Sequence, residues 1–162
     1  MPNDLGMGHD ELVRIAARWL RNTESCSVVI SEMHSQAEEP DAIGWRARFS
    51  VLIECKASHR DFIRDRQKLS RIEGGTYGMG FYRYYMAPEG LISKEELPPG
   101  WGLLEVDFVG RVHRTAKSKS WIQTPCGLRS ELGLVLSGLR RYQEEKQCAS
   151  SSPEQQDSSA RT

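Results

Sequence analysis

The chain lacks the sequence features of membrane proteins, secreted proteins and structural zinc proteins. No apolar run approaches the roughly 20 residues that a membrane-spanning helix needs. The first residues, MPNDLGMGHDE, lack the basic and then apolar layout of a secretory signal. The four cysteines are scattered and form no CxxC or CxxH pair, which argues against structural zinc and for free thiols in a reducing compartment. We therefore expect a cytoplasmic protein without membrane contacts.

The chain also lacks an excess of charge of either sign. Its 22 acidic and 22 basic residues give a formal net charge of zero. A protein that coats nucleic acid nonspecifically needs a strong positive excess, so the composition argues against that class while leaving room for local basic patches. The length of 162 residues predicts one domain, over residues 1–146. Residues 147–162 are rich in Ser, Gln and Pro without an apolar anchor, and we expect a disordered tail there.

Hydrophobic periodicity predicts a single α/β domain. Helices are expected over 10–21, over 58–72 with Ser58 as the capping residue, and over 129–146. The last helix closes the domain with an apolar stripe of Leu132, Val135, Leu136, Leu139 and Tyr142. Strands are expected at 26–33, 41–45, 48–56, 81–86, 101–107 and 110–113. This order predicts a mixed central β-sheet flanked by helices.

Three charged residues in two neighbouring predicted strands carry the strongest chemical signal. Asp41 follows Pro40, and Glu54 and Lys56 flank Cys55. Side chains alternate along a strand, so Glu54 and Lys56 share one face while Cys55 points into the core. Two carboxylates suit Mg²⁺, which takes few protein ligands, and a neighbouring lysine can position water or offset developing charge.

This order of elements, with PD in the second predicted strand and ExK in the third, resembles the PD-(D/E)xK nuclease superfamily. The segments PDAIGW and IECKASHRDFIRDRQK are similar to small nucleases of this type from phages and bacteria. The resemblance implies a restriction endonuclease-like fold, with Asp41, Glu54 and Lys56 in the catalytic roles. Many members add a glutamate from the first helix, and Glu11 is the matching residue.

The resemblance implies a Mg²⁺- or Mn²⁺-dependent deoxyribonuclease, with DNA as its partner, acting in DNA processing, repair or restriction. A duplex cutter of this size often needs two active sites, which allows a homodimer. Gly74, Gly75, Gly78 and Gly80 do not lead from a strand into a helix, so they do not form a dinucleotide- or phosphate-binding loop, and no organic cofactor is expected.

Other residues have both a functional and an ordinary interpretation. Glu32 is either a further metal ligand or a solvated strand end, and Glu11 also favours the helix dipole without any catalytic role. Basic residues that would contact nucleic acid, or simply lie on a solvated surface, are Arg64, Lys68, Arg83, Arg111, Arg114 and Lys117. Two alternatives remain for the whole chain. One is a catalytically weak DNA-binding subunit on the same fold, and the other is a phage-type interaction or inhibitory factor in which the motif is coincidental.

Overall fold

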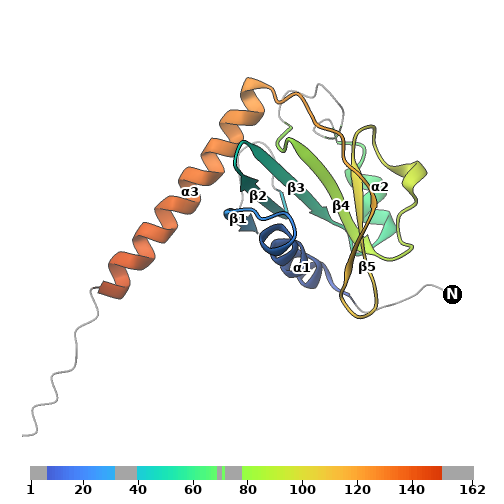
Figure 1. Ribbon diagram of the computed structural model, residues 1–162, viewed down its shortest axis with the longest axis horizontal. Coiled ribbons are helices and arrows are strands. Elements are labelled where there is room, and N and C mark those ends of the chain that lie inside the picture. The colour runs from blue at the N-terminus through green and yellow to red at the C-terminus, as the bar shows by residue number, and fades with distance from the viewer. Residues whose placement is uncertain (1–6, 32–39, 69–70, 72–77, 151–162) are drawn as a thin grey trace, which may run out of the picture.

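The computed structural model describes residues 7–31, 40–68, 71 and 78–150, and the helices and strands follow the predicted order (Figure 1). The helices are α1 (His9–Asn22), α2 (His59–Asp65), the short 3-10 helix η2 (Lys94–Glu96) and α3 (Pro125–Ser150). The strands are β1 (Val28–Ser31), β2 (Ala42–Arg46), β3 (Phe49–Cys55), β4 (Tyr82–Pro88), β5 (Gly102–Val106) and β6 (Val112–Ala116). Within the described ranges, no helix is long and apolar enough to cross a membrane.

The strands form one six-stranded mixed sheet in the order β1-β2-β3-β4-β5-β6. The central strands β3, β4 and β5 are parallel, and the remaining pairs are antiparallel. Glu54 of β3 is in register with Tyr85 of β4, which is in register with Leu103 of β5. Parallel strands finish at the same end of a sheet, and we call this end the carboxyl end. The predicted mixed sheet flanked by helices is confirmed.

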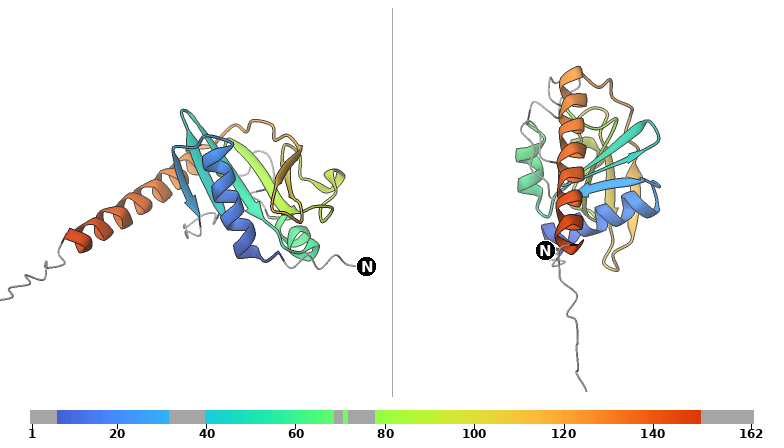
Figure 2. Two further views of the ribbon diagram at one scale, coloured as in Figure 1. Left: turned by 60° about the horizontal axis from the view of Figure 1, so that its bottom comes forward. Right: turned by 90° about the vertical axis from the view of Figure 1, so that its left-hand side faces the viewer.

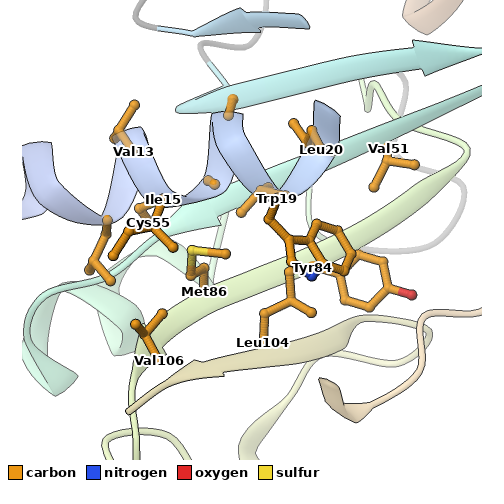
Figure 3. Close-up of a cluster of buried hydrophobic side chains, with 14 of the residues drawn as sticks. Val13, Ile15, Trp19, Leu20, Val51, Cys55, Tyr84, Met86, Leu104 and Val106 are labelled. Carbon is orange, nitrogen blue, oxygen red and sulfur yellow. The ribbon is translucent and has the colours of Figure 1, made fainter. Parts of the chain in front are cut away.

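Helix α1 covers one face of the sheet (Figure 3). Its buried residues recur at helical spacing, and Trp19 packs edge-on against Tyr84 with ring centroids 5.9 Å apart. On the opposite face, Phe62 of α2 packs edge-on against Tyr85 at 5.0 Å. The sheet is therefore buried on both faces, and polar side chains that lie between α2 and the sheet are shielded from water.

The predicted alternation in β3 is confirmed. Val51, Ile53 and Cys55 belong to the cluster under α1, whereas Leu52 belongs to the cluster on the other face. Cys55 is 1% exposed, as expected of a small core residue. Glu54 and Lys56 therefore point to the face that α2 covers.

Helices α2 and α3 differ in their bounds from the prediction. Helix α2 ends at Asp65 rather than near residue 72, and its predicted cap is confirmed because the Ser58 side chain accepts a hydrogen bond from the backbone N–H of Asp61. Helix α3 begins at Pro125 and continues to Ser150, so residues 147–150 are helical and not part of a disordered tail. The rest of the predicted tail, 151–162, lies outside the described residues.

The prediction that the apolar stripe of the last helix closes the core was wrong. Leu132, Leu136, Leu139 and Tyr142 are each at least 50% exposed, and the buried residues of α3 are Gly127, Glu131 and Leu134. The attachment is polar, because the Glu131 carboxylate accepts hydrogen bonds from Trp45, Ser50 and Gly80 at 2.8–2.9 Å. A buried carboxylate with several donors outweighs periodicity in deciding which side of the helix faces the sheet.

Candidate functional site

The structure brings Asp41, Glu54 and Lys56 together at the carboxyl end of the sheet. Asp41 precedes β2, Glu54 lies in β3, and Lys56 directly follows β3. The Nζ atom of Lys56 lies 3.1 Å from Glu54 Oε2 and 3.9 Å from Asp41 Oδ2. Glu54 is 2% and Lys56 9% exposed, so these charges interact with little screening by water.

The Asp41 carboxylate is held by the backbone of the neighbouring strand. Its Oδ2 atom accepts a hydrogen bond of 2.7 Å from the backbone N–H of Cys55. Its Oδ1 atom lies 3.3 Å from Nε2 of His9. His9 lies in the first turn of α1, and its side chain is half exposed. Asp41 therefore joins α1, β2 and β3, and one of its oxygens lies at the partly open side of the site.

Asp65 of α2 is a third carboxylate at this site, and it is not among the candidate residues that the sequence predicted. The structure buries it to 3% exposure, with Oδ1 at 3.5 Å from Lys56 Nζ and 2.7 Å from Lys68 Nζ. The sequence does indicate this orientation through spacing. Asp65 lies three residues after Phe62, so the two side chains lie on the same side of α2, and Phe62 is buried. Helical spacing from the core phenylalanine therefore predicts the inward orientation.

Arg71 and Tyr85 complete the network around these carboxylates. Arg71 is 1% exposed and donates two hydrogen bonds to Asp65, from Nε at 2.8 Å and from Nη2 at 3.1 Å. The Tyr85 hydroxyl donates to Asp65 Oδ2 at 2.8 Å. Tyr85 lies beside Glu54 in the parallel register, a relation that only the strand topology reveals.

One oxygen of the site remains without a hydrogen bond. The Oε1 atom of Glu54 lies 2.8 Å from Nη2 of Arg71, which is an ion-pair distance. It is buried and receives no hydrogen bond of normal geometry from the described residues. The Arg71 guanidinium therefore compensates this oxygen by its charge, while the hydrogen-bonding capacity of Oε1 is not used by the described residues.

Burial sets the protonation of Glu54. It raises the pKa of the Glu54 carboxyl to about 7, although Arg71 and Lys56 lower the pKa by their charge. Lys56 shows the opposite balance, because burial lowers its pKa but the charges of Glu54, Asp65 and Asp41 outweigh this effect and raise it. Lys56 is consequently an ammonium at neutral pH, suited to donate hydrogen bonds and to offset negative charge.

Asp65 and Tyr85 are held in fixed protonation states. Burial by itself raises the pKa of Asp65, but the hydrogen bond and charge of Arg71 and the charge of Lys56 outweigh it and hold the pKa well below its usual range. Burial, followed by the charge of Asp65, raises the pKa of Tyr85 well above its usual range. Asp65 is therefore an anion and Tyr85 a neutral donor across the physiological range.

The residues present fit a Mg²⁺ ion with few protein ligands. Mg²⁺ usually takes one or two carboxylates and keeps several waters or phosphate oxygens. Asp41 and Glu54 are the two carboxylates that would hold such an ion, because each has an oxygen within 3.9 Å of Lys56 Nζ at one end of the sheet. Among the described residues, no group of three or more His, Cys, Asp or Glu side chains is arranged to hold a metal.

Glu11, one of the two further acidic candidates, stands apart from this cluster. Glu11 lies in the first turn of α1, and its carboxylate pairs with Arg14 on the same helix. His9, rather than Glu11, is the α1 residue that contacts Asp41. Glu32 lies outside the described residues.

The six basic candidates for nucleic-acid contacts separate into three groups. Arg64 and Lys68 are exposed beside the site, and Arg111 is exposed next to the β5–β6 turn at the same end of the sheet. Lys117 is exposed but follows β6, at the opposite end.

The other two basic candidates have structural partners. Arg83 is 1% exposed, with its guanidinium 4.3 Å from the ring centroid of Trp121, so it presents no charge to a surface ligand. Arg114 pairs with the buried Glu24 and lies over the Trp19 ring. Neither belongs to the basic surface around the site.

Comparison with known proteins identifies the fold of this chain and leaves its activity open. No protein-family model and no curated protein matches the chain. A solved structure of a protein of unknown function from Silicibacter pomeroyi is similar, with a TM-score of 0.64 and 21% identity, over 85% of this chain and 90% of that chain. At this identity the likeness concerns the fold alone. The chain therefore has a mixed α/β fold, built on a six-stranded mixed sheet, that it shares with that protein.

Proposed function

We propose that this chain is a Mg²⁺- or Mn²⁺-dependent deoxyribonuclease with a restriction endonuclease-like fold. The observation that carries the proposal is the convergence of Asp41, Glu54 and Lys56 at one end of the sheet, with Glu54 Oε1 buried and without a hydrogen bond. Two carboxylates beside a lysine ammonium form a set of groups suited to hydrolysis of a phosphodiester.

Each residue of the site has a definite task in this proposal. Asp41 and Glu54 would hold the ion, which when bound polarises the phosphate and lowers the pKa of its water. Lys56 is charged at neutral pH, so it orients water or offsets negative charge and does not act as a base. Asp65 is a positioning residue, because it holds Lys56 at 3.5 Å without being among the proposed metal ligands.

The surroundings of the site favour a negatively charged polymer as substrate. Arg64 and Lys68 have side chains that are 69% and 60% exposed beside the site, and Arg111 is exposed at the same end of the sheet. Contacts of this kind hold phosphates in register without reading sequence. We therefore assign DNA binding to this end of the molecule.

The decisive experiment incubates the full chain with supercoiled, linear duplex and single-stranded DNA in Mg²⁺, Mn²⁺ or EDTA. We expect cleavage with metal, none with EDTA, and a loss of roughly 100-fold or more in Asp41→Asn and Lys56→Met. Matched controls are Glu145→Gln and Lys119→Met, which change exposed residues far along the chain. Cleavage that survives EDTA, or that persists in Asp41→Asn and Lys56→Met, would contradict the mechanism.

A second candidate function is DNA binding without cleavage, and the Arg71 contact favours it. Arg71 and Lys56 place two positive charges against Glu54 and Asp65, which reduces the negative charge that attracts a metal. In the same experiment, DNA binding without any cleavage supports this function. The interaction between Arg71 and Asp65 then has a purely structural role.

A further inference from the structure

Helix α3 carries an apolar stripe that its own domain leaves uncovered. The helix spans 26 residues and projects beyond the sheet in Figure 1 and in the left-hand view of Figure 2. Leu128, Leu132, Leu136, Leu139 and Tyr142 are 50–57% exposed. Exposed leucines scattered singly are ordinary, but a contiguous row along one helix indicates an interaction surface.

The spacing of this stripe is that of a helix pair. Taken with the half-buried Val135, the exposed residues Leu128, Leu132, Leu139 and Tyr142 follow one another at separations of four, three, four and three residues, and Leu136 lies beside this row. Alternation of three and four is the heptad pattern by which one helix packs into the grooves of another. The residues that attach α3 to the sheet, Glu131 and Leu134, lie on a neighbouring side of the helix. The stripe therefore remains available while α3 is attached.

The free part of α3 needs a packing partner to be a stable helix. Most helix stability in proteins comes from an apolar face packed against another element rather than from helix propensity. Gly133 and Gly138 lie within α3, and glycine is the weakest helix former apart from proline. A Cβ atom added at Gly133 would meet nothing within 4 Å, so the body of the domain does not support the helix there.

We propose that the stripe of α3 pairs with the same stripe of a second copy of this chain, in an antiparallel two-helix contact. The stripe is self-complementary, because an antiparallel pair sets Leu132 against the partner subunit's Leu139. In a parallel pair, Lys146, at the next heptad position after Tyr142, would face the partner's Lys146, and like charges at that position are unfavourable. The sequence thus favours the antiparallel direction.

The size of the surface sets the expected strength of the dimer. Residues 128–142 extend about 21 Å along a helix roughly 10 Å wide. This is below the area of a standard protein–protein interface, so we expect a concentration-dependent dimer with a dissociation constant on the order of micromolar.

The dimer and the candidate active site are separable in this fold. Glu131 attaches α3 to Trp45 and Ser50, at the end of the sheet opposite to Glu54. Variants on the stripe of α3 should therefore leave metal binding and any cleavage by the isolated chain intact. Failure of the nuclease proposal would not affect the dimer, and the reverse also holds.

Sedimentation equilibrium of the full chain over a wide concentration range tests the proposal. We expect the wild-type mass to rise from 18.4 kDa towards twice that value. Leu132→Glu and Leu139→Glu should remain monomeric, and Arg141→Glu, which alters an exposed residue off the stripe, should behave as the wild type. Circular dichroism confirms that the sheet of each variant is intact. A monomer at every concentration, or equal dimerisation of the leucine variants, would overturn the proposal.

Distance measurement between spin labels on the exposed Cys148 of the two copies, in a Cys126→Ser background, tests the direction. With a rise of 1.5 Å per residue, an antiparallel pair centred near residue 135 separates the two labels by about 40 Å, whereas a parallel pair holds them within about 20 Å. The longer distance supports the antiparallel contact, and the shorter distance overturns it.

Discussion

Replacing Glu54 with glutamine removes a buried charge whose cost can be worked out from the structure. Glu54 is 2% exposed, and burial raises its pKa from 4.5 to about 7 against the opposing charges of Arg71 and Lys56. A carboxyl whose pKa is higher in the folded state binds its proton more tightly there than in the unfolded chain. Folding stability therefore falls as pH rises from about 4.5 to about 7, over the range in which the unfolded carboxyl has already ionised.

The size of this effect follows from the shift. One pKa unit corresponds to 1.36 kcal/mol, so the shift of Glu54 corresponds to about 3 kcal/mol in the free energy of unfolding. Glutamine keeps the shape and exchanges no proton. Between pH 4.5 and pH 8, we expect the free energy of unfolding of the wild type to fall by about 3 kcal/mol relative to that of Glu54→Gln.

Urea unfolding, followed by tryptophan fluorescence at several pH values, measures this difference. Asp65 has the opposite sign, because its pKa is lowered and its contribution disappears as pH falls, but it is present in both proteins and cancels. Glu145→Gln, at an exposed position of α3, is the matched control and should follow the wild type. Parallel pH profiles of the wild type and Glu54→Gln would refute the reasoning.

Two other predictions concern the anchor of α3 and the thiols. Glu131→Ala leaves four donors, on Trp45, Ser50, Gly80 and Gln123, without their acceptor and should lower the free energy of unfolding by at least about 3 kcal/mol, whereas Glu131→Gln keeps one carbonyl oxygen and should lower it less. Equal losses in the two variants, measured by urea unfolding, would contradict this account. In a thiol-reagent titration of the native protein, Cys148 should react first, because it is exposed, and Cys55 only after unfolding, because burial raises the pKa of its thiol and leaves it 1% exposed. Simultaneous reaction of both in the native protein would be inconsistent with the buried position of Cys55.

Much of the fold was predictable from local patterns. The apolar stripe of α1 specifies which side of the helix is buried, and the alternation in β3 specifies which residues share a face of the sheet; the structure agrees with both. These patterns succeed because they depend only on the repeat of a helix or a strand. For α3, the spacing of apolar residues predicts a stripe packed on the core, and this prediction was wrong. The helix is attached to the sheet through the carboxylate of Glu131.

The candidate site shows the same division. The motif predicts that Asp41, Glu54 and Lys56 meet, because strand alternation and the short connection between the strands are local properties. It does not predict Arg71 or Tyr85. Arg71 approaches Asp65 from a segment between helix and strand, and Tyr85 comes from a strand 30 residues downstream of Cys55.

By itself, the sequence determined the order of helices and strands, the faces of β3 and the three charged residues at its end. The tertiary structure alone decided that Asp65, Arg71 and Tyr85 join them, that Arg83 lies in the core, and that the stripe of α3 stays exposed. The physical reason is that the spacing of apolar residues indicates which side of a helix or strand is buried. It does not indicate which residues of other elements lie against that side. Partners of buried charges depend on contacts between distant segments, and those exist only once the chain has folded.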